Sequence, residues 1–302
     1  MNWEKTGFLF DLNQYTKEYR GAAVPMALKL YGSVYRIYYT ARDKNGCSNI
    51  FYVDVDIIKN KIISVVTKPI LSPGEFGCFD DRGAMTSWIL KSDEYFYLYY
   101  TGWNLGKTVP FHNSIGLAVS EDGINFKRKY TGPILDREKN ESIFCSNPCV
   151  LKENDIWRMW YISCVKWIYE DGEMKHYYHI KYAESMNGIE WKREGKVCID
   201  FKNDAEYALS RPCVLKMNGL YRMFYSYRGD KYRIGYAESQ DGIEWTRKDE
   251  EAGINVSNDG FDSDMICYAY VFECEGEYYM LYNGNKYGMT GFGIAKLQES
   301  GH

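Results

Sequence analysis

Three carboxylates stand at similar distances before the start of an apolar segment. Asp81 and Glu206 each lie six residues ahead of such a segment, and Asp264 lies five residues ahead of another. Cleavage of a glycosidic bond needs one carboxyl group that protonates the leaving oxygen and a second that activates water or attacks directly. The pattern therefore predicts Asp81, Glu206 and Asp264 as catalytic residues, with the first two as the acid pair and the third as a helper.

The two members of the predicted pair have different neighbours in the chain. Asp81 is followed by Arg82, whose positive charge favours an ionised carboxylate. Glu206 lies within Ala-Glu-Tyr-Ala-Leu, where a more apolar setting favours the protonated form that a proton donor needs. The alternative is that each acid only caps a turn or pairs with an arginine, and this alternative applies most strongly to Asp80.

Basic, amide and aromatic side chains recur near the same apolar segments. The predicted substrate-binding residues are Arg20, Arg82, Trp103, Asn147, Arg211, Arg228, Tyr268 and Lys286. Rings offer a surface on which a sugar can stack, and a few convergent polar groups fix its orientation. Carboxylates, guanidinium groups and rings at one rim are therefore the composition expected of a carbohydrate site.

An internal repeat indicates the elements that would position these residues. The repeated phrase occurs as Ser120-Glu-Asp-Gly-Ile-Asn-Phe126, Ser185-Met-Asn-Gly-Ile-Glu-Trp191 and Ser239-Gln-Asp-Gly-Ile-Glu-Trp245. Its Asp-Gly and Asn-Gly pairs supply the positive φ angles of a tight β-turn. An Ala- or Gly-containing strand precedes each phrase, and an aromatic strand and an apolar strand come earlier. Four antiparallel strands repeated about every 60 residues are typical of one blade of a β-propeller.

The two ends of the chain predict how the repeat closes. The apolar strand begins at five places, which are Pro25, Ser87, Pro148, Pro212 and Ala269. The fifth copy stops after its third strand, Gly291 to Leu297, and the N-terminal segment Asn2 to Gly7 reads like the fourth strand Glu190 to Gly195. We therefore expect a single all-β domain, residues 1–302, that is a five-bladed β-propeller of four-stranded antiparallel blades. The N-terminal strand would close the ring and remove its free edges.

Composition excludes several classes of function. The net charge is −4 and no basic stripe is present, so nucleic-acid binding is disfavoured. No run of 18 apolar residues predicts a membrane span, and the N-terminus lacks a signal core, so a cytoplasmic protein is expected. Nine cysteines without a Cys-x-x-Cys pair and only four histidines predict no metal site. No cofactor is expected. Cys149 and Cys213 occupy equivalent apolar strands and are predicted to be core residues.

One segment breaks the regular pattern. Lys166 to Tyr178 is the longest insert between predicted strands, and its polar stretch Glu170 to Lys175 indicates a turn. We expect this insert to be irregular. It follows the aromatic strand of the third repeat, so it would lie at the predicted rim.

The repeated phrase, the Tyr-x-Met-Trp/Phe-Tyr strands and the Asn147-Pro148 and Arg211-Pro212 starts carry a resemblance. The chain resembles the five-bladed β-propeller glycosidase superfamily of arabinanases, invertases and mannoside phosphorylases. The segment Tyr282 to Ala295 is similar to the last blade of bacterial glycosylase-like proteins of polysaccharide loci. The resemblance departs at the first blade, where Ala22 to Ala27 holds no acid, although arabinanases have an aspartate there.

The resemblance implies an enzyme that cleaves glycosidic bonds by hydrolysis or phosphorolysis. Phosphorylases of this superfamily use one acid and a basic cluster that holds phosphate. Such a cluster could consist of Arg20, Arg82, Arg211 and Lys286, which could equally hold an acidic sugar or a sugar phosphate. Two alternatives stay open. One is a non-catalytic or transfer-associated propeller that binds a glycan or sugar nucleotide, and the other is a protein-interaction propeller.

Overall fold

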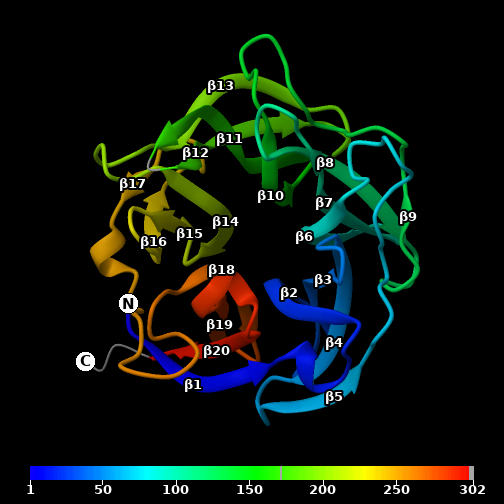
Figure 1. Cartoon of the computed structure of the whole chain (residues 1–302). Helices are drawn as coiled ribbons and strands as arrows, with labels where there is room; N and C mark the ends of the chain where they lie inside the picture. The colour runs from blue at the N-terminus through cyan, green and yellow to red at the C-terminus, as the bar shows by residue number, and fades with distance from the viewer. Residues whose placement is uncertain (171, 299–302) are drawn as a thin grey trace.

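The computed structural model describes residues 1–170 and 172–298, and their regular structure is almost entirely antiparallel β-sheet (Figure 1). Within these residues the only helical elements are short 3-10 turns, η1 (Leu12–Gln14), η2 (Asp249–Glu251) and η3 (Asn285–Gly288). No helix in the described part of the chain has the length and apolar character needed to cross a membrane. The predicted all-β architecture is confirmed.

The strands form groups of four in chain order. The first group is β2 (Tyr19–Tyr31), β3 (Val34–Asp43), β4 (Ser48–Asp56) and β5 (Lys61–Val65). The second is β6 (Gly83–Ser92), β7 (Tyr95–Leu105), β8 (Phe111–Ser120) and β9 (Lys127–Arg128). The third is β10 (Cys145–Glu153), β11 (Ile156–Glu170), β12 (Glu173–Ser185) and β13 (Lys192–Ile199). The fourth is β14 (Ala208–Met217), β15 (Leu220–Arg228), β16 (Tyr232–Ser239) and β17 (Thr246–Arg247).

The last group joins the two ends of the chain. Its strands are β18 (Cys267–Cys274), β19 (Glu277–Asn283), β20 (Phe292–Leu297) and β1 (Trp3–Phe10). They are hydrogen-bonded in the order β18, β19, β20, β1, and β1 runs antiparallel to β20. The N-terminal segment therefore lies as the fourth strand beside the C-terminal strands, as the sequence predicts.

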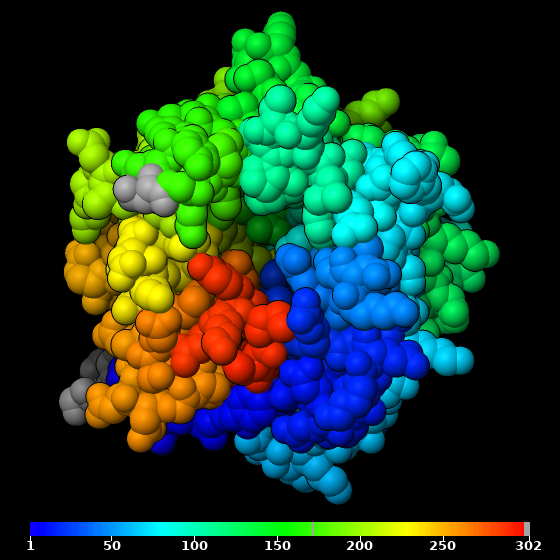
Figure 2. Space-filling model, viewed as in Figure 1, coloured from blue at the N-terminus to red at the C-terminus, as the bar shows by residue number. Residues whose placement is uncertain are grey.

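The first strands of the groups gather at the middle of the molecule (Figure 1). Strand β2 contacts β6, β6 contacts β10, β10 contacts β14, β14 contacts β18, and β18 contacts β2. The groups are otherwise joined through few backbone pairs, since a single parallel residue pair links β4 to β6 and another links β12 to β14. Figure 2 shows that the face seen in that view is hollowed near its middle.

A strained backbone position recurs in the first strands. The residue before the apolar start has a φ of 45 to 58° in four of them, at Val24, Asn147, Arg211 and Tyr268. The ladder to the second strand shifts register at each of these positions. A positive φ is costly for a residue with a Cβ, above all for the β-branched Val24, and such strain is concentrated at functional sites.

Neighbouring groups hold these bulges in place. The backbone N–H of Val24 donates to Asn283 Oδ1 at 2.8 Å, that of Asn147 to Thr101 Oγ1 at 2.9 Å, and that of Tyr268 to Ser226 Oγ at 2.7 Å. In each case the acceptor lies in the second strand of the preceding group. A polar side chain that satisfies an otherwise unpaired N–H fixes the direction of the bulged residue.

The repeated phrase forms a clasp between groups. Asp122 Oδ1 accepts the N–H groups of Ile124 and Asn125, and the equivalent Asn187 and Asp241 make the same bonds. The glycine carbonyl of each turn accepts a hydrogen bond from the preceding group. The donors are Tyr38 Oη to Gly123, Tyr99 Oη to Gly188 and Trp160 Nε1 to Gly242, at 2.7 to 2.8 Å. Each copy of the phrase therefore links two neighbouring sheets through its glycine carbonyl.

The predicted core cysteines are confirmed. Cys149 and Cys213 are fully buried, and all nine cysteines are free thiols. Their sulfur atoms accept the N–H groups of Val214 and Val271, which belong to the first strands of the following groups. Each thiol therefore packs as a small apolar side chain and also links two neighbouring sheets.

Candidate functional site

A cavity of about 360 Å³ opens where strands of several groups end near the middle of the molecule. Its walls include three predicted substrate-binding residues, Trp103 at the end of β7, Asn147 in β10 and Tyr268 in β18. Arg42 at the end of β3 and Tyr178 in β12 complete much of the lining. We call this space the central cavity. The sequence offsets thus bring together residues that lie up to 165 positions apart (268 − 103).

Bulges aim two of these side chains. Asn147 and Tyr268 occupy the positive-φ positions of β10 and β18, so their side chains leave the regular alternation of the strand. The strain described above therefore coincides with the cavity wall. This coincidence is expected of a site whose residues are held in place by their surroundings.

An aromatic wall comes from the long hairpin of β11 and β12. The ring of His176 stacks on Tyr178 with centroids 5.0 Å apart and also lies 5.0 Å from Trp167. Burial, together with the nearby charge of Arg228, lowers the pKa of His176 to about 4. The imidazole that lines the cavity is therefore neutral at physiological pH.

This hairpin corrects one expectation. The insert Lys166 to Tyr178 is not irregular, because β11 continues to Glu170 and β12 begins at Glu173. Because an irregular insert was expected there, His176 and Tyr178 were not among the predicted site residues. The signal that could have found them is the aromatic run His176-Tyr-Tyr-His179, which continues the pattern of a strand.

Arg42 lines the cavity, and two more arginines, Arg20 and Arg82, lie beside residues of its wall. Nη2 of Arg82 donates to the carbonyl of Asn45 at 3.0 Å. Arg42 lies over the ring of Trp103 at 5.7 Å and stands directly opposite Arg20 across the β2–β3 ladder. The backbone N–H of Arg82 donates to the carbonyl of Trp103 at 3.1 Å. None of these three guanidinium groups forms an ion pair with a described residue. Like charges that face each other across a ladder destabilise a sheet, so this side of the cavity favours an anion.

The two remaining predicted arginines lie deeper. Arg211 is fully buried and donates from Nη2 to the carbonyl of Pro25 at 3.3 Å and from Nη1 to the carbonyl of Ser87. Arg228, at the end of β15, lies against tyrosine rings beside the cavity. Lys286 is exposed in η3, which precedes β20.

The three predicted catalytic carboxylates are not brought together in the central cavity, since none of them lines it. Asp81 lies in the loop before β6, next to Arg82, and its Oδ2 accepts the N–H of Gly77 at 2.9 Å. Asp264 is half-exposed and pairs with Lys231 at 3.1 Å. Of the three, Asp81 is the one next to Arg82, whose backbone N–H is hydrogen-bonded to the cavity residue Trp103.

Glu206 lies in a different cavity and is held by an arginine. Arg247 donates from Nη1 to Oε2 at 2.7 Å and from Nη2 to Oε1 at 2.9 Å, and the N–H of Lys202 also donates to Oε2. Such a bidentate pair occupies both carboxylate oxygens of Glu206, which favours a structural role over contact with a substrate. The sequence could not reveal this partner, which comes 41 residues later in the chain.

Equivalent acids of other groups make the same kind of contact. Each pairs with a base from the fourth strand, as Asp80 does with Arg128, Glu141 with Arg193 and Asp262 with Lys5, at 2.6 to 3.0 Å. Each also accepts a hydrogen bond from a tyrosine of the second strand; these are Tyr100, Tyr161 and Tyr282. The ion-pair alternative raised for Asp80 thus describes its surroundings. Glu206 has the same kind of ion pair, with Arg247, but the tyrosine of its group, Tyr225, donates to Asp249.

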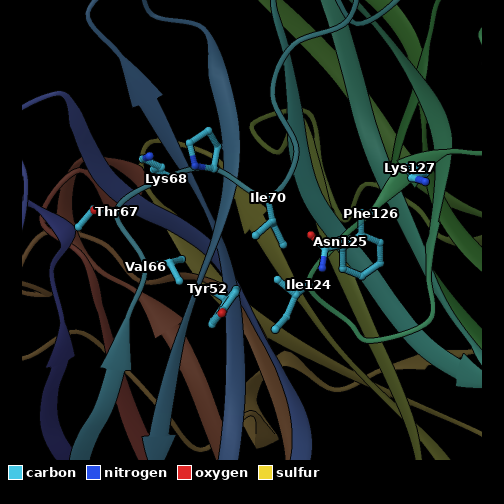
Figure 3. Close-up of a pocket in the computed structure, with 10 residues that line it drawn as sticks. Tyr52, Val66, Thr67, Lys68, Ile70, Ile124, Asn125, Phe126 and Lys127 are labelled. Atoms are coloured by element: carbon cyan, nitrogen blue, oxygen red, sulfur yellow. The ribbon is translucent and has the colours of Figure 1, made fainter.

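Another cavity, of about 560 Å³, lies between the first and second groups (Figure 3). Tyr52, Ile70 and Phe126 form its apolar part, and Lys68 and Lys127 lie at its edge. None of its lining residues is a carboxylate or a predicted site residue. Among residues 1–170 and 172–298, no group of three or more His, Cys, Asp or Glu side chains could hold a metal ion.

Comparisons with known proteins agree with this architecture. No family model matches the chain. An uncharacterized protein of Mycobacterium tuberculosis, MT1551, is 40% identical over 99% of this chain and 100% of its own length. A 1,2-beta-oligomannan phosphorylase of a Thermoanaerobacter species is 28% identical over 63% of this chain and 60% of its own length.

Solved structures show the same fold. The protein BT0996, in an RGII complex, superposes with a TM-score of 0.77 at 18% identity, over 99% of this chain and 92% of the other. A thermostable family-43 glycoside hydrolase gives 0.67 at 17% identity, over 93% and 90%. The chain therefore belongs to one family with the mycobacterial protein MT1551, and it shares the fold of these solved structures.

Proposed function

We propose that this protein is an enzyme that cleaves a glycosidic bond in the central cavity of a five-bladed propeller. Each four-stranded group is one blade, and β1 closes the ring as the outer strand of the last blade. The cyclic contacts of the first strands and the antiparallel pairing of β1 with β20 support this interpretation.

The lining of the central cavity is the observation that carries the proposal. Trp103, Tyr178 and Tyr268 offer ring faces on which a sugar can stack, and the amide of Asn147 can orient a hydroxyl group. A concave site with a mainly apolar wall and a few fixed polar groups is the usual form of a small-ligand site. The likeness in fold to glycoside hydrolases gives the reaction class by analogy only.

We assign the acid to Asp81. Glu206 and Asp264 have basic partners of their own, whereas Asp81 forms no ion pair with a described residue, because Nη2 of its neighbour Arg82 donates to the carbonyl of Asn45 instead. Asp81 therefore takes the role of proton donor that its sequence surroundings suggested for Glu206. In the proposed step the carboxyl group of Asp81 gives its proton to the glycosidic oxygen as the bond to the anomeric carbon breaks. An anionic oxygen of phosphate then forms the new bond to that carbon; if water attacks in its place, the carboxylate of Asp81 takes up the proton that the water loses.

Phosphate is the acceptor that the basic residues favour. Arg20, Arg42 and Arg82 lack ion pairs with described residues, and guanidinium forks match the paired oxygens of phosphate. The similarity to an oligomannan phosphorylase points the same way. The products would then be a sugar 1-phosphate and a glycan shortened by one unit.

A second candidate is a glycan-binding propeller without catalysis. It is favoured by one observation, which is that no carboxylate is among the residues that line the described central cavity. Binding would use the same rings and the same amide, and no bond would break.

Incubation with β-1,2-linked oligomannan and related oligosaccharides tests both candidates. The enzyme proposal expects a sugar 1-phosphate that forms only when phosphate is present. D81N should abolish product formation, whereas the matched variant D264N should leave it near the wild-type rate. Release of free sugar without phosphate would instead indicate hydrolysis. Binding without any product would support the second candidate and overturn the first.

A further inference from the structure

We propose that the substrate of the central cavity is an acidic sugar whose carboxylate is bound by Arg228. This inference rests on the proposed function and names the class of substrate. It depends on the surroundings of two arginines, Arg228 beside the cavity and Arg211 at the bulge of β14.

Arg228 lies in a cage of tyrosine rings. Its guanidinium carbon is 5.2 Å from the ring centre of Tyr207 and 5.6 Å from those of Tyr232 and Tyr287. The hydroxyl of Tyr232 bonds to that of Tyr178, a cavity residue, at 2.5 Å, and the ring of Tyr232 lies 5.9 Å from that of Tyr268. The cage is therefore continuous with the cavity wall.

The guanidinium of Arg228 has no anionic partner in the described chain. Its Nε atom is buried and forms no hydrogen bond, and no carboxylate of residues 1–170 and 172–298 lies within ion-pair distance. Several half-buried arginines have such partners; examples are Arg36 with Asp54, Arg128 with Asp80, Arg193 with Glu141 and Arg247 with Glu206. An unpaired Nε also occurs in Arg247, so it is the missing ion pair that distinguishes Arg228 from these four. Buried polar groups are normally satisfied, so an unsatisfied one beside a cavity indicates a missing ligand group.

Arg211 adds a second positive charge that the protein does not balance. It occupies in β14 the bulge position that Asn147 and Tyr268 occupy in β10 and β18. It is fully buried, its only hydrogen bonds go to two carbonyl groups, and its Nε has no partner. A buried charge without a counter-ion is costly, and an anion bound near the bulges of the first strands, where Asn147 and Tyr268 line the cavity, would reduce that cost.

The geometry at Arg228 favours a carboxylate over free phosphate. Three rings cover its surroundings, so a ligand must approach along the free edge of the guanidinium plane. A planar group with two oxygens and one charge matches one such edge, whereas phosphate carries more charge and usually gathers several donors. The other unpaired arginines, Arg20 and Arg42, lie in the first blade and not in this cage.

Binding of monosaccharides measured by calorimetry tests the inference. The probes are glucuronic, galacturonic and mannuronic acid, each compared with its neutral parent sugar at constant ionic strength. At least one acid should bind about tenfold or more tightly than its parent, because a charge-assisted bond contributes that much. R228Q should remove this preference, and higher salt should weaken it.

R222Q is the matched control. Arg222 lies on the same strand, is half-buried, has an unpaired Nε and lies opposite Glu238, away from the cavity. It should keep the preference, and thermal unfolding of both variants checks that each is folded. A preference that survives in R228Q, or no preference in the wild type, would overturn the inference.

The outcomes also separate this inference from the proposed function. Neutral sugars that bind in a manner abolished by W103A, without any gain from a carboxylate, would retain the proposed site and reject the acidic substrate. Inorganic phosphate that binds while acidic sugars gain nothing would reject the inference and favour phosphorolysis. Absence of binding by every acidic and neutral sugar would overturn both.

Discussion

Asp81 and Glu206 lie at the same sequence offset but have different surroundings, so we expect the first to act in catalysis and the second to stabilise the fold. Asp81 has one backbone N–H as its partner, whereas Glu206 is 6% exposed and held by both terminal nitrogens of Arg247. We expect D81N to lose activity and keep its stability. We expect E206Q to keep the rate of the folded enzyme and to lose on the order of 3 kcal/mol of unfolding free energy, because it breaks a buried pair.

Denaturant unfolding and initial rates, measured on the same preparations, check this pair of expectations. A folded E206Q protein without activity would return Glu206 to the catalytic group. Full activity in D81N would remove Asp81 from it.

His176 gives a prediction about pH at the scale of one side chain. Its pKa is lowered to about 4 by burial and by Arg228, whereas an unfolded histidine titrates near 6.5. The unfolded state therefore binds more protons between these values, and stability falls as the pH drops from about 6.5 to about 4. Carboxylates titrate in the lower part of this window, so the comparison must be with H176Q.

The H176Q variant should lose less stability than the wild type between about pH 6.5 and about pH 4.5. Chemical denaturation at several pH values measures the difference. Parallel pH profiles for the two proteins would show that His176 is not held neutral.

The repeated turn is stabilised by its own hydrogen bonds, and each copy links two neighbouring groups. Hydrogen bonds from its own turn hold the pKa of Asp122 well below its usual range; the largest effect is that of the backbone N–H of Asn125. A depressed carboxyl pKa gives stability that is present above the unfolded value of about 4 and is lost as the pH falls through the folded value. Asn187 makes the equivalent backbone bonds in the next repeat without a charge.

We therefore expect D122N to retain the turn and D122A to lose about 1 kcal/mol, as for other side-chain caps. Only the wild type should show the part of the loss of stability in acid that comes from protonation of Asp122. Thermal unfolding at about pH 7 and at about pH 3 measures both effects. Equal loss in D122N and D122A would mean that the charge, and not the bonding pattern, stabilises the turn.

The elements could be predicted from the sequence to the extent that local signals define them. Asp-Gly and Asn-Gly turns and alternating aromatic residues mark strands, so the order of strands and the pairing of the N-terminal strand follow from the repeat. The β11–β12 segment also contains an Asp-Gly pair, Asp171-Gly172, but the polar residues around it, Glu170 to Lys175, indicate a loop and hide the strands on either side. The sequence offsets predicted three residues that line the central cavity, Trp103, Asn147 and Tyr268. They could not predict partners such as Arg247, which comes close to Glu206 only in the folded sheet.

At the scale of the whole molecule, stability depends on how β1 joins the two ends of the chain. Trp3 packs edge-on against Phe224 of the fourth group with ring centres 5.7 Å apart, and its backbone N–H donates to the carbonyl of Gly253. Lys5 reaches Asp262 at 2.6 Å, where the carboxylate also accepts the hydroxyl of Tyr282. One short strand thus connects the last group to the fourth as well as to itself.

This arrangement predicts a large effect of a conservative change in β1. K5M keeps the length of the side chain but leaves the buried carboxylate of Asp262 without its base, and we expect a loss of about 3 kcal/mol. K29M removes a comparable ion pair, with Glu275, in which both side chains are about half exposed, and should cost less than about 1 kcal/mol. Denaturant unfolding measures both losses. Because β1 connects two groups, K5M should lower the midpoint of a single transition. A separate early transition confined to the last group would contradict cooperative unfolding of the groups as one unit.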